Sequence, residues 1–280
     1  AEAVRRAALA YDPDAQIVLQ NEQLGTAHAV AQAGPALDGF AGDALVLYGD
    51  TPFIRAETLA AMAQARATHD IVVLGFEAAD AGRYGRLIMA GDALERIVEF
   101  KDATNEERSV SLCNSGVIAA KSSVLFDLIA AVDNDNAAGE YYLTDIIGIA
   151  RAKGLSATVV RCDEAETLGV NSRAELIAAE AAFQATARAA AIADGVTLLA
   201  PQTVFFAYDT CIGRDAVIEQ NVVFGPNVTV ESGATIRAFS HLEGCHVSRG
   251  ATVGPYARLR PGAELQEDVH IGNFVEIKNA

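Results

Sequence analysis

The sequence predicts a two-domain protein in which an α/β domain is followed by a parallel β-helix built from hexapeptide repeats. In roughly the first 170 residues, short apolar segments alternate with segments of helical length, which is typical of a sheet covered by helices. From Ile212 onward an apolar residue recurs at every sixth position, which is the signature of a hexapeptide β-helix. A length of 280 residues accommodates two ordinary domains.

The composition narrows the classes of partner. The chain carries 37 acidic and 21 basic residues, for a net charge of −16, which argues against a nucleic-acid-binding surface. It contains no apolar run long enough for a transmembrane helix, so we expect no membrane partner. The four cysteines lie far apart and match no zinc spacing, which predicts free thiols in a cytoplasmic protein. They are Cys113, Cys162, Cys211 and Cys245.

The N-terminal stretch predicts a helix over Ala1–Ala10, a short strand over Gln16–Leu19 and a second helix from Ala27 to Gln32. Thr26 precedes this second helix and is expected to cap it. The beginning of a helix presents free backbone donors to an anion or to the edge of a nucleobase. This turn is therefore a candidate for ligand binding.

Two glutamines, Gln20 and Gln23, precede the same turn. Each carries an amide that can pair with a carbonyl-and-imide edge such as that of uracil. In isolation, two glutamines near a turn are ordinary solvated side chains, so the residues by themselves leave both interpretations open.

The apolar run Ala44–Leu47 leads into Tyr48, Gly49 and Asp50 and stops at Pro52. An unbroken apolar run bounded by turn residues predicts a buried strand of a parallel sheet. Ligands of such sheets lie beyond the carboxyl ends of the strands, and a carboxylate there suits Mg²⁺ that carries phosphates. The segment is equally compatible with an Asp that simply starts a turn.

The remainder of the first half continues the alternation of strands and helices. Expected strands are Ile71–Phe76, Leu87–Ala90, Leu94–Phe100, Val117–Ala120 and Ser156–Arg161, and expected helices are Glu57–His69, Ser123–Val132 and the segment from Asp145 to Ala152. Ser172 and Glu175 have the spacing of a capping box, which predicts a long helix to about Ala193. We therefore expect domains over residues 1–172 and 195–280, joined by a linker helix over 173–194.

The repeat is regular. Apolar residues stand at twelve positions, which are Ile212, Ile218, Phe224, Val230, Ile236, Leu242, Val247, Val253, Leu259, Leu265, Ile271 and Ile277. One five-residue step, between Leu242 and Val247, interrupts the period, and small side chains recur four residues after each apolar position except at His246. Each coil of such a helix stacks on the next and buries one apolar ladder.

These features together resemble one family, the bacterial bifunctional N-acetylglucosamine-1-phosphate uridyltransferase/glucosamine-1-phosphate acetyltransferases, over essentially the whole chain. The resemblance rests on Leu19–Thr26, Leu47–Pro52, Tyr84–Arg86, Ile97–Ala103, Asn114–Gly116, Gly139–Asp145, Gly169–Asn171 and Ala257–Gly262. It implies a Rossmann-like nucleotide-diphospho-sugar transferase domain followed by a left-handed β-helix with three hexapeptides per coil, in a cytoplasmic homotrimer.

The resemblance also implies site residues. Asp50 and Asn171 would be catalytic and hold Mg²⁺. The residues implied to bind UDP-N-acetylglucosamine are Gln20, Gln23, Gly25, Thr26, Tyr48, Gly49, Asp50, Gly85, Glu99, Asn114, Tyr142, Thr144 and Asn171. Gly85 as a turn residue and Glu99 as a strand-edge charge would each be unremarkable outside this set.

For the acetyltransferase half, the resemblance implies that Arg260 and Lys278 bind the sugar phosphate, with acetyl-CoA as co-substrate. Two cations can clamp a phosphate, although they also fit a solvated face of the β-helix. The implied small-molecule partners are UTP, N-acetylglucosamine-1-phosphate and glucosamine-1-phosphate.

Two departures from the family pattern stand out. The Gly-rich loop that cradles the triphosphate and the coils that carry the catalytic histidine have no counterpart in these 280 residues. We therefore expect a piece of a longer protein, truncated at both ends, and its own activity stays open. Two alternatives also remain: an adenylyl- or guanylyltransferase for sugar 1-phosphates that bears hexapeptides, or a non-catalytic trimeric scaffold.

Overall fold

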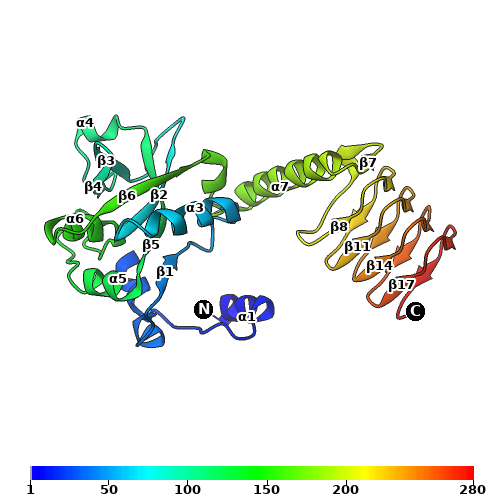
Figure 1. Ribbon diagram of the computed structural model, residues 1–280, viewed down its shortest axis with the longest axis horizontal. Helices are drawn as coiled ribbons and strands as arrows, with labels where there is room; N and C mark the ends of the chain where they lie inside the picture. Colours follow the sequence, from blue (N-terminus) through cyan, green and yellow to red (C-terminus); the bar gives the residue numbers. More distant parts are fainter. Residues whose placement is uncertain (1) are drawn as a thin grey trace. The chain divides into compact units, whose positions relative to one another are not determined.

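The computed structural model describes residues 2–280 and divides into two compact units, Ala1–Val170 and Asn171–Ala280 (Figure 1). Unit 1 contains the helices α1 (Glu2–Tyr11), α2 (Thr26–Ala31), α3 (Ala56–Arg66), α4 (Asn105–Arg108), α5 (Ser122–Ile129) and α6 (Ile146–Ala152). Its strands are β1 (Asp43–Val46), β2 (Ile71–Glu77), β3 (Arg86–Ala90), β4 (Ala93–Val98), β5 (Leu112–Lys121) and β6 (Ala157–Cys162). No helix among residues 2–280 is both long and apolar enough to cross a membrane.

Unit 1 is built on one mixed sheet with the strand order β4-β3-β5-β2-β6. Only β2 and β6 are parallel, whereas β5 runs antiparallel to β1, β2 and β3. Alternate residues of β2 face opposite sides of the sheet, as the two-residue period of a strand requires. Ile71 packs in the core with α5 and α6, and Val72 packs in a second core around Met62 of α3. Helices therefore cover both faces, as the α/β prediction requires.

Strand β1 differs from its prediction as a buried strand of a parallel sheet. It pairs antiparallel with β5 alone, in the register Asp43↔Lys121 to Val46↔Ile118. Its residues alternate between exposed and half-buried, and Leu45 keeps 42% of its surface exposed. A strand with a partner on one side only buries alternate side chains, so an unbroken apolar run is not proof of full burial.

Two local predictions near the N-terminus are also wrong. Gln16–Leu19 forms no strand, and Ile17, Val18 and Leu19 are 38%, 44% and 58% exposed. Thr26 does not cap α2: Gly25 occupies the N-cap position, and the Thr26 hydroxyl accepts a hydrogen bond from the Leu143 N–H at 2.9 Å. A tertiary donor from a distant loop therefore displaces the local cap.

Unit 2 begins with α7 (Arg173–Ala193). The Ser172 hydroxyl accepts from the Glu175 N–H at 3.2 Å, as a capping box requires, but the Glu175 carboxylate accepts from the Asn171 N–H at 2.7 Å. Further along, the buried Gln184 side chain donates to the Phe206 carbonyl at 2.7 Å and accepts from the Phe206 N–H at 3.0 Å. The helix that we predicted as a linker is thus fastened to the unit that contains the β-helix.

The β-helix consists of three parallel sheets of very short strands, from β7 (Thr197–Leu198) to β19 (Glu276–Ile277). Strand partners within one sheet are Val223↔His241, His241↔Arg258 and Arg258↔Glu276, so successive coils are 18, 17 and 18 residues apart (241 − 223, 258 − 241, 276 − 258). Each coil therefore contains three hexapeptides, and the 17-residue coil takes up the five-residue step. The prediction of a hexapeptide β-helix is confirmed.

The apolar positions of the repeat form the core of unit 2, where Ile218, Leu242 and Leu259 are fully buried. Between them, corners of the chain adopt left-handed backbone, with φ between 55° and 85° at every sixth position apart from the short step. These corners are Asp215, Asn221, Asn227, Gly233, Phe239, Gly244, Gly250, Tyr256, Gly262, Asp268 and Phe274. Most are Gly, Asn or Asp, the residues that tolerate this conformation best.

Candidate functional site

In unit 1 the turn around Gly25 lies against the Gly139–Asp145 segment. The Tyr141 N–H donates to the Leu24 carbonyl at 2.8 Å, and the Ala27 N–H donates to the Tyr141 carbonyl at 2.9 Å. Gly25 has φ 116°, and a Cβ there would lie 2.5 Å from the Tyr141 oxygen. Glycine is required at this position for both reasons, because side chains avoid this backbone region and the space is filled.

The two glutamines of this turn are placed differently. The Gln20 amide donates to the Gly25 carbonyl at 3.2 Å and lies 3.0 Å from Nδ1 of His28. These contacts stabilise the turn between Gln20 and α2. Gln23 is exposed. The Gln23 side chain is therefore available to bind a ligand, whereas the Gln20 side chain stabilises the turn.

Four residues implied to contact the sugar come together from four separate segments. The Asn114 N–H of β5 donates to the Gly85 carbonyl at 2.9 Å. The Thr144 hydroxyl donates to Oε1 of Glu99 at 3.1 Å. A Cβ on Gly85 would lie 3.5 Å from both carboxylate oxygens of Glu99, so the Gly85 backbone faces that carboxylate directly. Glu99 and Tyr142 line two hollows of about 360 and 440 Å³.

The electrostatics of this cluster are set by burial. Burial raises the pKa of Glu99, and the hydrogen bond from Thr144 opposes this effect in part. Burial also raises the pKa of Tyr48, with further contributions from the charges of Glu99 and Asp50. Both charges favour the neutral form of Tyr48. Its phenol stays protonated at neutral pH and available as a hydrogen-bond donor.

Gly116 is a site residue that the sequence alone did not single out. It has φ 87°, and a Cβ there would collide with the Tyr48 ring. The absence of a side chain at Gly116 thus lets the Tyr48 ring pack against β5 and determines the position of that ring. Its position in the Asn114–Gly116 motif was the available signal.

Asp50 lies in the loop after β1, and its carboxylate is exposed. The Val170 N–H donates to the Asp50 carbonyl at 2.8 Å, so the residue before Asn171 is tied to the Asp50 backbone. Asn171 itself is the first residue of unit 2. Among residues 2–280 no group of three or more His, Cys, Asp or Glu side chains is arranged to hold a metal. A single free carboxylate with amide oxygens still fits Mg²⁺, which keeps several waters and takes oxygens from substrate phosphates.

Glu166 fastens the same two loops at a second point, and no sequence motif pointed to it. Its side chain is 4% exposed and accepts hydrogen bonds from the Arg55 N–H at 3.0 Å and the Thr58 hydroxyl at 2.7 Å. Both donors belong to the first turn of α3 or its N-cap, where backbone donors have no partner within the helix. The segment that leads to Val170 is thereby held against the start of α3.

In unit 2 the two cations implied to bind a sugar phosphate lie on neighbouring coils. The Arg260 N–H donates to the carbonyl of Ile277, the residue before Lys278, at 2.9 Å. The Arg260 guanidinium also pairs with Glu276 at 3.3 Å, and this carboxylate competes with an incoming phosphate. The pair is therefore adjacent, but only Lys278 is without a carboxylate partner among the described residues.

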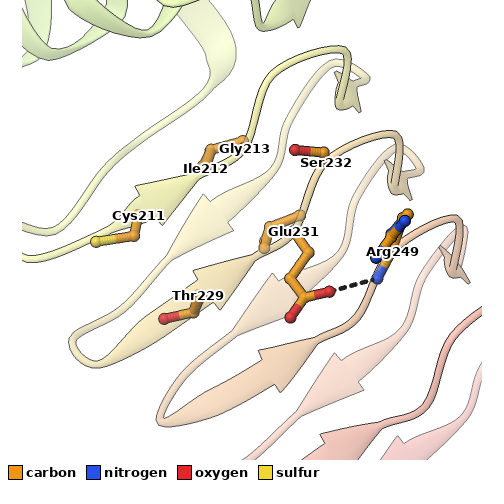
Figure 2. Close-up of a pocket in the computed structure, with 8 residues that line it drawn as sticks. Cys211, Ile212, Gly213, Thr229, Glu231, Ser232 and Arg249 are labelled. Atoms are coloured by element: carbon orange, nitrogen blue, oxygen red, sulfur yellow. Dashed lines mark hydrogen bonds between the residues drawn. The ribbon is translucent and has the colours of Figure 1, made fainter.

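A separate hollow of about 640 Å³ lies on the surface of the β-helix (Figure 2), lined by Cys211, Ile212, Gly213, Thr229, Val230, Glu231, Ser232 and Arg249. Across it the Glu231 carboxylate accepts a hydrogen bond from the Arg249 N–H at 2.9 Å. The residues that the sequence implied for binding lie outside its lining. The functional prediction therefore rests on unit 1 and on Arg260 and Lys278.

Comparison with known proteins agrees with the sequence motifs. The nucleotidyl transferase family model matches residues 5–165. The chain is 66% identical over 280 residues to the "Bifunctional protein GlmU" of Roseobacter denitrificans and 70% identical over 280 residues to that of Ruegeria pomeroyi. The protein of the same name from Sphingopyxis alaskensis is 55% identical over 269 residues.

These matches cover 100%, 100% and 95% of this chain and 62%, 62% and 60% of the three relatives, so the chain spans about three fifths of their length. The resemblance inferred from the motifs is confirmed. Since the family model covers more than half of the sequence, the chain belongs to the nucleotidyl transferase family.

Proposed function

We propose that the protein to which this chain belongs makes UDP-N-acetylglucosamine by two reactions. Unit 1 transfers a uridylyl group from UTP to N-acetylglucosamine-1-phosphate and releases pyrophosphate. Unit 2 belongs to a domain that transfers an acetyl group from acetyl-CoA to glucosamine-1-phosphate. The observation that carries the first activity is the convergence of Gly85, Glu99, Asn114 and Thr144 beside Tyr48 and the Asp50 loop.

In the proposed reaction the chain positions two substrates. The turn with Gln23, Gly25 and Thr26 receives the uracil edge, because its backbone is locked against Tyr141. Glu99 and Asn114 receive the hydroxyl and acetamido groups of the sugar. The sugar-phosphate oxygen then attacks the α-phosphorus, and pyrophosphate leaves, so positioning and charge neutralisation supply the catalysis.

We assign Mg²⁺ to Asp50 and Asn171. When bound, the cation neutralises the phosphate oxygens and orients them for in-line displacement. The hydrogen bond from Val170 to the Asp50 carbonyl supports this assignment, because it ties the backbone beside Asn171 to the Asp50 loop. Gly49 precedes Asp50, and a Cβ added at Gly49 would meet nothing within 4 Å, which leaves open space beside the proposed cation.

The assembly and location of the protein are part of the same proposal. A parallel β-helix offers flat side faces, and we propose that three chains associate through them in the cytoplasm. The acetyltransferase site would then use Arg260 and Lys278 toward the sugar phosphate, with Glu276 displaced from Arg260 when the phosphate binds.

Calorimetric titration of UDP-N-acetylglucosamine with MgCl₂ tests the first activity on this chain. Wild type is expected to bind, and Glu99→Gln to lose roughly 10- to 150-fold in affinity, since a hydrogen bond to a charged group contributes about 1.5–3 kcal/mol. Glu95→Gln is the matched control, because Glu95 lies on β4, four residues before Glu99, and pairs with Arg151 instead.

Absence of heat with wild type would favour a scaffold role for the chain. Tighter binding of an ADP- or GDP-sugar would favour the adenylyl or guanylyl alternative. For the complete protein, release of pyrophosphate from UTP and N-acetylglucosamine-1-phosphate is the decisive assay.

A further inference from the structure

Arg86 is the largest fully buried side chain of the molecule, with 2% of its surface exposed. No carboxylate among the described residues forms an ion pair with it. Burying a charge without an opposite charge is costly unless hydrogen bonds satisfy it. The hydrogen bonds of this guanidinium therefore show which segments it holds.

Backbone carbonyls take all five N–H donors of Arg86. Nη1 donates to the carbonyls of Ala81, at 3.2 Å, and Tyr84, and Nη2 donates to Gly82 at 3.2 Å. Nε and Nη2 both donate to the Arg108 carbonyl, at 3.4 and 3.3 Å. Because a guanidinium carries five donors, Arg86 has none left for a ligand. It can influence a ligand only through the segments that it holds.

The first of these segments is the loop before β3. Three of its carbonyls, those of Ala81, Gly82 and Tyr84, converge on one guanidinium, and the next residue is Gly85. The loop is otherwise held by few bonds, such as that from the Tyr84 N–H to the Ala81 carbonyl at 3.1 Å. The Gly85 carbonyl also accepts from the Asn114 N–H at 2.9 Å, so β5 holds the Gly85 backbone on one side and Arg86 holds the loop that leads to it on the other.

The second segment follows Glu99. Arg108 donates from Nε and Nη2 to the Phe100 carbonyl, at 3.3 and 3.1 Å, and its guanidinium lies 4.6 Å from the centre of the Phe100 ring. Arg86 lies 5.9 Å from the centre of the same ring and binds the Arg108 carbonyl. Two guanidinium groups thus hold the residue that follows Glu99.

We propose that Arg86 is a positioning residue for the sugar half of the site, which sets the spacing between the Gly85 backbone and the Glu99 carboxylate. This inference rests on the proposed function, since it concerns the pocket assigned there to the acetamido sugar. Lysine cannot replace it, because an ammonium has three donors and no planar fork. The hydrogen bonds of Arg86 do not reach the uracil turn around Gly25, which should be unaffected.

Arg86→Lys, tested in the full chain, separates positioning from simple stabilisation. We expect its affinity for UDP-N-acetylglucosamine to fall at least tenfold and its affinity for UMP to stay within twofold of wild type. Amide hydrogen exchange should accelerate in residues 81–85 and 99–102. Arg66→Lys is the matched control, because Arg66 is another mostly buried guanidinium of unit 1, bonded to the His69 carbonyl and Asp43.

Arg108→Lys provides a milder second variant in case Arg86→Lys does not fold. It removes the fork on the Phe100 carbonyl but leaves the bonds of Arg86 in place, so only residues 99–102 should exchange faster, with a smaller loss of sugar affinity. Equal losses for UMP and the UDP-sugar, or equal losses in Arg66→Lys, would overturn the proposal.

If wild type fails to bind the UDP-sugar, a scaffold role is favoured for the chain, and hydrogen exchange alone then decides whether Arg86 holds the loop before Gly85. Unchanged exchange at residues 81–85 in Arg86→Lys would overturn the positioning role of Arg86.

Discussion

The Val170 N–H donates to the Asp50 carbonyl at 2.8 Å and joins the loop after β1 to the loop after β6. Glu166 makes a second connection between the same segments through Arg55 and Thr58. The loop after β1 is therefore held at Asp50 itself and at its end beside α3, while the Asp50 carboxylate stays exposed. This combination of a fixed backbone and a free carboxylate is what a metal ligand requires.

Asp50→Asn should abolish the effect of Mg²⁺ on binding of UDP-N-acetylglucosamine and leave the melting temperature within about 1 °C of wild type. The reason is that the carboxylate makes no hydrogen bond or ion pair with residues 2–280, while the backbone bond to Val170 is retained. Titrations with and without MgCl₂ provide the measurement. If the variant keeps the full effect of Mg²⁺, the metal assignment to Asp50 is wrong.

Glu166→Ala should lower the free energy of unfolding by about 1–3 kcal/mol, because it removes the carboxylate oxygen Oε2 that accepts from both the Arg55 N–H and the Thr58 hydroxyl and leaves these donors without a partner. It should also weaken Mn²⁺ binding in the presence of the UDP-sugar, measured by electron paramagnetic resonance. Asp70→Ala is the control: Asp70 joins the start of β2 to the start of β6 by accepting two bonds from Ser156 on one carboxylate oxygen, both at 2.8 Å, away from the Asp50 loop. Comparable destabilisation with unchanged Mn²⁺ binding is expected there. If both variants bound Mn²⁺ equally well, Glu166 would have only a structural role.

Much of this architecture could be predicted because its signals are local and repeated. The six-residue period of unit 2, with its five-residue step, reappears as coils of 18, 17 and 18 residues. Ser172 is recognisable as a helix cap from its spacing to Glu175 alone. In both cases the partner lies a fixed number of residues away along the chain.

The parts that could not be predicted depend on distant partners. The Thr26 hydroxyl bonds Leu143 instead of its own helix, and β1 finds an antiparallel neighbour on one side only. Glu166 looks like an ordinary charged residue in the sequence, and the Tyr84–Arg86 motif does not reveal the burial of Arg86, although both side chains are almost completely buried. Their roles appear only when segments far apart in sequence are brought together.

Asp145→Asn should stabilise the protein at pH 7.5 and change little at pH 4. Burial, and then the charges of Asp133, Glu99 and Asp102, raise the pKa of Asp145 to about 6 in the folded state, from 3.8. The folded state therefore binds the proton more tightly than the unfolded chain, and wild-type stability falls as the pH rises from about 4 to 6. Melting temperatures between pH 4 and 7.5 measure this slope.

The control for this pH series is Asp92→Asn, at an exposed turn carboxylate. Its stability profile should run parallel to that of wild type, whereas Asp145→Asn should be flatter between pH 4 and 6. A slope in Asp145→Asn as steep as in wild type would assign the pH dependence to another group.

Gly25→Ala should lower the free energy of unfolding by more than backbone strain alone would, because Gly25 combines φ 116° with a Cβ position 2.5 Å from the Tyr141 carbonyl oxygen. Gly39→Ala measures the milder strain of a left-handed φ without a clash, since Gly39 has φ 73° and nothing within 4 Å of its Cβ position, whereas Gly25 has φ 116° and ψ 177°, a region essentially restricted to glycine. A side chain at a left-handed φ costs about 1–2 kcal/mol, so chemical denaturation should give that loss of unfolding free energy for Gly39→Ala. Gly25→Ala should lose more stability than Gly39→Ala. It should also bind UMP more weakly, because relief of the clash moves the turn away from Tyr141. Equal losses of stability in the two variants, with UMP affinity unchanged, would mean that the turn tolerates the methyl group and does not position the uracil.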